Sequence, residues 1–173
     1  MIEQIENNTS FSPLDLKRWT PFRMFRVAEA MGSILAEYYG PDFGLKRHEW
    51  RALAVIANHP EATAREISEL GDMDPFTASR AIQQLSRLGY VIRGQKASDK
   101  RQASLTLLPR GEEVVGRISS LARSLEAALL TEFSETEQRT LGEFLRRMED
   151  ATAVLRARDR HDLLMEEVPD NAS

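Results

Sequence analysis

The stretch MDPFTASRAIQQLSRLGYVIR, residues 73–93, decides the fold. Asp74 followed by Pro75 is typical of a helix start, because an aspartate side chain accepts hydrogen bonds from free backbone N–H groups and proline lacks a donor that the first turn cannot use. Apolar residues then recur at intervals of three and four until Gly89 interrupts the pattern. We therefore predict a helix over about 75–89 with one buried face.

The other face of this helix is polar and predicts contact with DNA. An α-helix fits the major groove of B-DNA, where short polar side chains of its first turns reach the base edges. The side chains that we expect to contact DNA from this helix are Phe76, Thr77, Ser79, Arg80, Gln83, Gln84 and Arg87. The pattern leaves open which of them contact bases and which contact phosphates.

The residues before this helix predict a bracing partner. Thr63 and Glu66 stand three apart, as in a capping box, and Gly71 follows, so a short helix over 64–70 is expected. A further helix from about Lys46 to Asn58 carries apolar residues at helical spacing. Two short helices joined by a tight connection form a helix-turn-helix unit.

After Gly89 the apolar period changes from helical to alternating, which predicts a two-stranded hairpin over about 91–107. We expect its tip near residues 98–100. The hairpin is basic, and an arginine at the tip of such a wing can enter the narrow, electronegative minor groove. Its predicted DNA contacts are Arg93, Lys96, Lys100 and Arg101.

Charge is distributed unevenly along the 173 residues, although the net charge is only -4. Residues 80–110 contain 7 Lys and Arg against 1 Asp, a balance of +6. Residues 1–79 balance to -4, from 8 against 12, and residues 111–173 balance to -6, from 8 against 14. The basic segment coincides with the predicted reader. This supports DNA binding, because DNA affinity depends on where the cations lie and not on the net charge.

Long amphipathic helices flank this reader and predict a homodimer. They are expected over 20–39, 110–131 and 135–157, too long for the small reader to cover. Two readers related by a twofold axis would bind a palindromic operator with half-sites roughly 34–36 Å apart. The predicted organisation is a flexible arm over 1–19, a domain over 20–160 with its DNA reader at 46–108 and dimerisation helices at 20–39 and 110–157, and a frayed acidic tail over 161–173. The predicted fold class is mainly α with a small β-hairpin wing, a winged helix-turn-helix.

Residues 20–157 resemble the MarR family of bacterial transcription regulators. The segment 73–93 is similar to the family's recognition helix and first wing strand, and SDKRQASLTLLPRGEEVV, residues 98–115, to its wing tip, second strand and next helix. The resemblance implies that Asp99 orients Arg101 for the minor groove and that Arg80 helps hold the DNA backbone. Leu108 departs from the family, which commonly places a threonine cap there.

The resemblance also implies a small aromatic or anionic effector bound between the dimerisation helices and the reader. The candidate lining residues are Arg23, Phe25, Tyr38, Tyr39, His48, Trp50 and Arg51. A core role is the alternative for apolar residues at this spacing. Arg51 follows Trp50 where urate-responsive relatives have an acidic residue, which argues against urate, and the absence of cysteine excludes a thiol peroxide sensor.

Other function classes find little support in the sequence. No phosphate-cradling, zinc-protease, serine-hydrolase or dinucleotide fingerprint is present, so we expect neither an enzyme nor a cofactor. The three histidines, His48, His59 and His161, lie far apart and have no cysteine companions, so no metal site is expected. Lacking long apolar runs, the chain is predicted to be cytoplasmic without a membrane partner. The predicted function is that of a sequence-specific DNA-binding transcription regulator that acts as a repressor, and the alternative is a winged-helix module that binds another protein.

Overall fold

The computed structural model describes residues 13–96 and 99–158, except for the side chains of Asp99 and Lys100. The chain divides after Leu125 into two compact units, each of which is described by itself. The first unit contains α1 (Thr20–Phe43), α2 (Arg47–Asn58), α3 (Ala64–Leu70), α4 (Pro75–Arg87), β1 (Val91–Lys96), β2 (Asp99–Leu107) and most of α5 (Pro109–Leu129). The second contains α6 (Glu135–Ala157).

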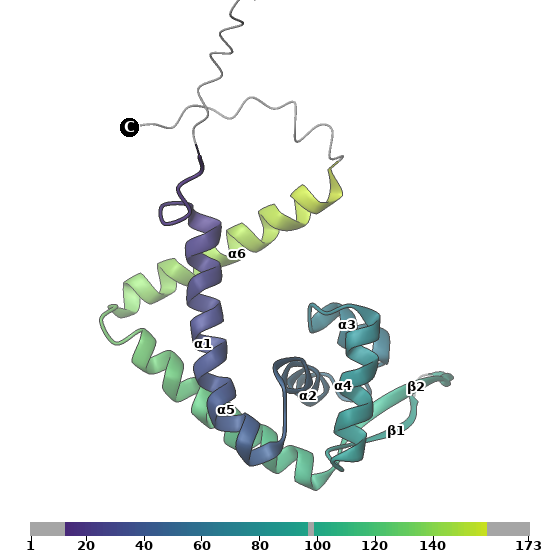
Figure 1. Ribbon diagram of the computed structural model, residues 1–173. Helices are drawn as coiled ribbons and strands as arrows, with labels where there is room; N and C mark the ends of the chain where they lie inside the picture. The colour runs from purple at the N-terminus through teal and green to yellow at the C-terminus, as the bar shows by residue number, and fades with distance from the viewer. Residues whose placement is uncertain (1–12, 97–98, 159–173) are drawn as a thin grey trace, which may run out of the picture. The chain divides into compact units, whose positions relative to one another are not determined.

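Helices α2, α3 and α4 pack against one another and against the hairpin (Figure 1). Asp74 caps α4 as predicted, since its Oδ1 accepts hydrogen bonds from the backbone N–H groups of Phe76 at 3.0 Å and Thr77 at 2.9 Å. The four-residue turn between α3 and α4 is closed by Ser68, whose hydroxyl donates to the Met73 carbonyl at 2.7 Å. The helix-turn-helix predicted from the sequence is therefore confirmed.

The wing is an antiparallel pair in which Val91 lies opposite Leu107 and Gln95 opposite Ala103. A third segment joins it, because the Leu105 N–H donates to the Ala62 carbonyl at 3.0 Å. The predicted position of the tip was partly wrong. The register shifts after Gln95 and brings Lys96 opposite Asp99, so β2 begins at Asp99, inside the predicted tip, while Ser98 lies outside the described residues.

The hydrophobic core of the first unit joins the reader to α1 and α5. The inward stripe of α4 is fully buried, with Ala78, Ala81, Ile82 and Leu85 at 1% exposure or less. Tyr90 follows Gly89, which adopts a left-handed backbone conformation with φ 70°. The side chain of Tyr90 is buried, and its hydroxyl donates a hydrogen bond to the Phe43 carbonyl at 3.1 Å. This core fixes the direction in which the outer face of α4 points.

Helix α1 is longer than predicted. We expected it to stop at about residue 39 before Gly40 and Pro41, but it continues to Phe43. A proline removes only one backbone donor, and the helix ends two residues later at Phe43. Gly44 caps this end, since it adopts φ 66° and donates its N–H to the Gly40 carbonyl at 2.9 Å. The helix starts at Thr20, as predicted.

Helix α6 begins at a capping box. The Ser134 backbone N–H donates to Glu137 Oε2 at 2.8 Å, and the Glu137 N–H donates to the Ser134 hydroxyl at 3.3 Å. None of its residues is buried. The predicted apolar stripe of α6 is therefore present in the sequence, but none of its residues is buried within the part of the chain that the structure describes.

Candidate nucleic-acid interface

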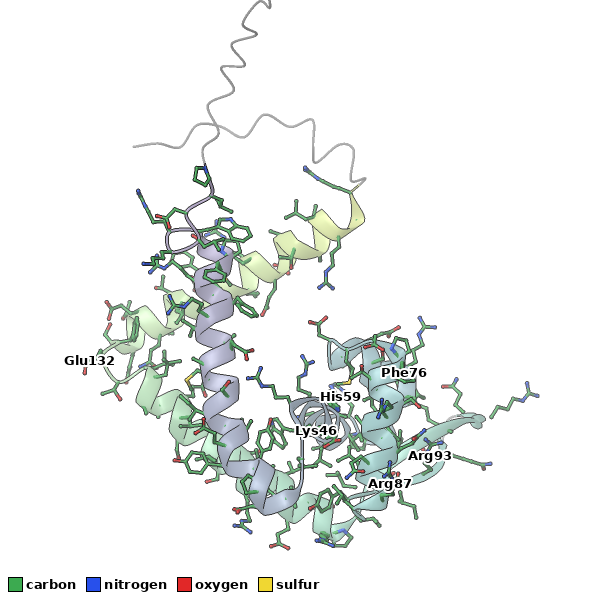
Figure 2. The ribbon with its side chains drawn as sticks, viewed as in Figure 1. Lys46, His59, Phe76, Arg87, Arg93 and Glu132 are labelled. Atoms are coloured by element: carbon green, nitrogen blue, oxygen red, sulfur yellow. The ribbon has the colours of Figure 1, made fainter. Side chains whose placement is uncertain are left out.

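The outer face of α4 presents its predicted contact residues to solvent. Phe76 near the start of the helix is 69% exposed, and the Arg80 guanidinium lies 5.6 Å from the centre of its ring. Gln83 and Arg87 are exposed, and Thr77, Ser79 and Gln84 are half-buried. Figure 2 shows Phe76 and Arg87 at opposite ends of α4, with Arg93 on the neighbouring strand.

One hollow lies between α4 and the start of α2, and we call it the α2 hollow. Its volume is about 510 Å³. Its lining residues are Gly44, Lys46, His48, Glu49, Phe76, Thr77, Arg80, Gln84 and Arg87. Three of these side chains are cationic at neutral pH, and the single carboxylate, Glu49, belongs to a residue only 5% exposed. Lys46 was not among the residues that sequence reasoning selected.

A second hollow, which we call the wing hollow, lies on the β1 side of α4. It has a volume of about 770 Å³ and is lined by Gln83, Ser86, Arg87, Val91, Ile92, Arg93 and Leu108. Arg87 lines both hollows, so the predicted cations Arg80, Arg87 and Arg93 form one continuous surface across the helix and the wing. Arg101 lies exposed on β2.

Lys96 has an internal partner in the structure. Its Nζ lies 2.9 Å from Glu66 Oε1, and the lysine side chain is only 26% exposed. Glu66 also accepts the Thr63 backbone N–H at 2.7 Å as part of the α3 capping box. Lys96 thus links the wing to α3, and its contact with DNA stays a prediction.

These contacts predict how Glu66 affects stability. The Thr63 backbone N–H first, and then Lys96, lower the pKa of Glu66 from 4.5 to about 2. A carboxyl group whose pKa falls on folding stabilises the folded state above its unfolded pKa, and this contribution is lost as the pH drops towards the folded pKa. We expect Glu66→Gln to lower the free energy of unfolding at neutral pH, with the difference from wild type shrinking between about pH 4.5 and pH 2.

Urea unfolding at a series of pH values measures this difference. Glu69→Gln is the matched control, because it removes a carboxylate from the same helix that pairs with Arg65 and not with the wing. A difference for Glu66→Gln that stays constant down to pH 2 would contradict the assignment.

The candidate effector residues do not gather in one cavity of the described chain. Tyr39 is buried and its ring centre lies 6.1 Å from that of Trp50, an arrangement typical of a core. Phe25 and Tyr38 are 59% and 56% exposed, and Arg23 and Arg51 are exposed as well. His48 lines the α2 hollow. The effector lining stays a prediction.

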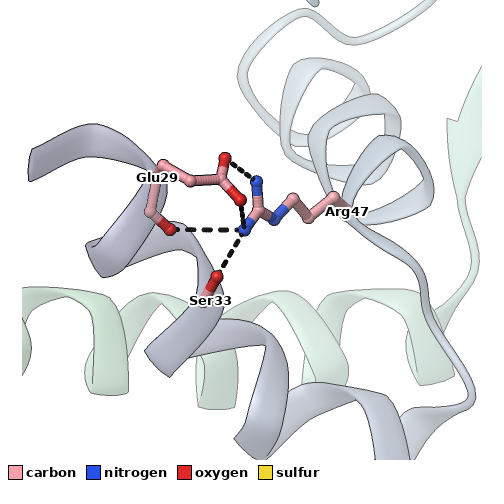
Figure 3. A network of polar contacts seen from close by, with 3 residues as sticks. All are labelled: Glu29, Ser33 and Arg47. Carbon is pink, nitrogen blue, oxygen red and sulfur yellow. Dashed lines mark hydrogen bonds and ion pairs between the residues drawn. The ribbon is translucent and has the colours of Figure 1, made fainter. Parts of the chain in front are cut away.

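A polar network that the sequence did not reveal ties α1 to the start of α2 (Figure 3). The Arg47 guanidinium donates to both carboxylate oxygens of Glu29, at 2.5 and 2.9 Å, and to the Ser33 hydroxyl at 2.8 Å. These hydrogen bonds lower the pKa of the Glu29 carboxyl. The network joins a predicted dimerisation helix to the reader. Its residues are 14 to 18 positions apart in the sequence, so no local sequence pattern could predict it.

Within the described residues, no three His, Asp or Glu side chains cluster as metal ligands would. In the same part of the chain, no helix is both long and apolar enough to cross a membrane.

The helix-turn-helix, the basic hairpin and the cationic surface between them define a winged helix-turn-helix protein. Comparison with known proteins identifies the particular kind. The sequence profile of the MarR family matches residues 43–102, which contain the helix-turn-helix and the first part of the wing.

Two relatives of this chain are transcription regulators. The chain is 28% identical over 93 residues to the HTH-type transcriptional regulator BilQ of Clostridium symbiosum, covering 54% of this chain and 65% of that protein. It is 23% identical over 128 residues to the transcriptional repressor Rv2887 of Mycobacterium tuberculosis, covering 74% and 89%. The first relatives are thus matched over less than two thirds of their length.

Solved structures share the fold. A MarR/EmrR family regulator from Acinetobacter superposes with a TM-score of 0.72 at 24% identity, over 81% of this chain and 99% of the other. The transcriptional regulator SlyA gives a TM-score of 0.69 at 26% identity, over 80% and 94%. The predicted fold class and family resemblance are confirmed.

Proposed function

We propose that the protein is a homodimeric repressor that binds a palindromic DNA operator. The observation that carries the proposal is the continuous cationic surface formed by Arg80 and Arg87 on α4 and Arg93 on β1. Helix α4 occupies the major groove, where Ser79, Gln83 and Gln84 face the base edges, and the wing with Asp99, Lys100 and Arg101 reaches the flanking minor groove. Kinship with transcription regulators supports this assignment.

The exposed apolar residues of the long helices support the dimer. On α1, Phe25, Val27 and Tyr38 are each more than half exposed. On α6, Phe144 is 50% and Val154 is 58% exposed, and this helix has no buried residue. Apolar stripes of this extent mark interaction surfaces. A second copy of the chain, related by a twofold axis, would bury them. The domain roles follow, with the reader at 46–108 and dimerisation helices on either side.

The salt dependence of DNA binding tests the proposal. Cations that neutralise phosphates release counterions, so the logarithm of the association constant falls linearly with the logarithm of salt concentration, with a slope of about -0.9 per phosphate contact. For a dimer making about 6 to 10 phosphate contacts we expect an affinity loss of about 10³ to 10⁵ between 50 and 200 mM salt. Fluorescence anisotropy with a duplex selected from a random pool measures this slope.

The competing proposal is a winged-helix module that binds another protein through α4. A selected duplex that binds with an affinity independent of salt, or a failure to select any duplex, would favour this module. Release of DNA by a small aromatic or anionic effector remains a prediction from the family, and a thermal-shift screen against phenolic acids tests it.

A further inference from the structure

The α2 hollow has a charge and a position that the predicted contacts of α4 do not account for. Arg80 and Arg87 line it from α4, and Lys46 and His48 line it from the start of α2. The first turn of α2 adds the positive end of its helix dipole. Cationic groups from two separate elements therefore converge on one cavity of about 510 Å³.

The one carboxylate in the lining does not cancel this charge. Glu49 is 5% exposed, and its Oε2 accepts the Lys46 backbone N–H at 2.6 Å. Its Oε1 lies 3.7 Å from His48 Nε2. Both oxygens are thus directed at groups of the protein itself, which leaves the cationic side chains of Lys46, Arg80 and Arg87 as the charges that a ligand meets. The hollow therefore suits an oxyanion.

The dimensions of DNA indicate which oxyanion. The major groove is about 12 Å wide, and an α-helix with its side chains is about 10 to 12 Å across. A helix lying in the groove therefore has a phosphodiester strand along each flank. The two flanks of α4 are the α2 hollow and the wing hollow, so each hollow faces one strand.

We propose that the α2 hollow binds a backbone phosphate of the duplex and that Lys46 and His48 are additional DNA-contacting residues. This inference rests on the proposed function, since it places α4 in the major groove. Lys46 supplies the charge, and His48 supplies a hydrogen-bond donor beside it. Arg93 in the wing hollow contacts the opposite strand.

The test compares Lys46→Gln with Lys17→Gln in the full-length protein. Both variants remove one lysine charge, and Lys17 lies exposed before α1, outside the lining of the hollow. Anisotropy titrations with the selected duplex and with a random-sequence duplex give the salt slope for each variant. We expect Lys46→Gln to weaken binding to both duplexes and to reduce the magnitude of the slope by about 1 per protomer, and Lys17→Gln to leave it unchanged.

The outcomes separate this inference from the proposed function. If wild type binds with a steep slope and Lys46→Gln retains that slope, the hollow does not contact a phosphate, although the protein still binds DNA. If wild type does not bind DNA, the proposed function fails first. If calorimetry shows that wild type binds inorganic phosphate or benzoate without DNA and that Lys46→Gln does not, the hollow is a site for a free anion, and the backbone assignment is overturned.

Discussion

Phe144→Asp is expected to convert the proposed dimer to a monomer and to weaken binding to a palindromic duplex by about 100-fold or more. The ring of Phe144 is 50% exposed in the single chain, where the Arg147 guanidinium lies 6.0 Å from its centre. A carboxylate there meets water in the monomer but would be desolvated against the apolar stripe of a partner. Losing the second reader removes the gain of about 10² to 10⁴ from two linked binding events.

Sedimentation equilibrium measures the oligomeric state, and anisotropy with palindromic and half-site duplexes measures the affinity. Phe144→Leu is the matched control, because it keeps an apolar side chain at the same position and should remain a dimer. The affinity of Phe144→Asp for a half-site should stay near that of wild type, since α6 belongs to the unit that does not contain α4. A Phe144→Asp protein that remains dimeric would show that α6 does not form the interface.

The same reasoning explains why α6 can be amphipathic and yet bury nothing. An apolar stripe at helical spacing predicts burial but does not name the surface that covers it. For α4 the covering surface is in the same chain, and Ala81 and Leu85 are fully buried. For α6 no residue is buried, and the proposed dimer would supply the covering surface. Sequence periodicity alone cannot distinguish these two cases.

Local signals predicted the reader well because their physical causes are local. The caps at Asp74, Thr63 and Ser134 each satisfy backbone donors within three residues, so the sequence contains the whole interaction. The end of α1 was placed too early, at about residue 39, because Gly40 and Pro41 interrupt the helical pattern there, although α1 continues through both to Phe43. Helix positions could thus be predicted to within a few residues.

Contacts between distant residues could not be predicted in this way. The ion pair of Lys96 with Glu66 was not predicted, because Glu66 lies 30 residues earlier and approaches the wing only in the folded chain. Arg47 and Glu29 meet across two helices. Lys46 became a candidate only when the fold placed the start of α2 beside α4. Each depends on tertiary packing, about which a charge pattern carries no information.

Gly111→Ala is expected to destabilise the protein by about 3 kcal/mol and to lower the melting temperature by about 10 °C. Gly111 is buried in the first turn of α5, and a Cβ atom added there would lie 2.1 Å from the Tyr90 carbonyl oxygen and 3.0 Å from its carbon. These are backbone atoms, which cannot swing aside like a side chain. The same carbonyl accepts the Leu108 N–H at 2.9 Å, so relieving the clash would break the junction of α4, β1 and α5.

Gly116→Ala in the same helix separates this clash from the helix propensity of alanine. A Cβ atom at Gly116 would meet no atom within 4 Å, so this variant should be stabilised by about 1 kcal/mol. Denaturant unfolding followed by circular dichroism measures both variants. Because Tyr90 joins the end of α4 to the wing, Gly111→Ala should also weaken DNA binding at temperatures where the protein is still folded. A Gly111→Ala protein as stable as Gly116→Ala would mean that α5 can shift away from Tyr90 at no cost, and the junction would then not hold the wing in place.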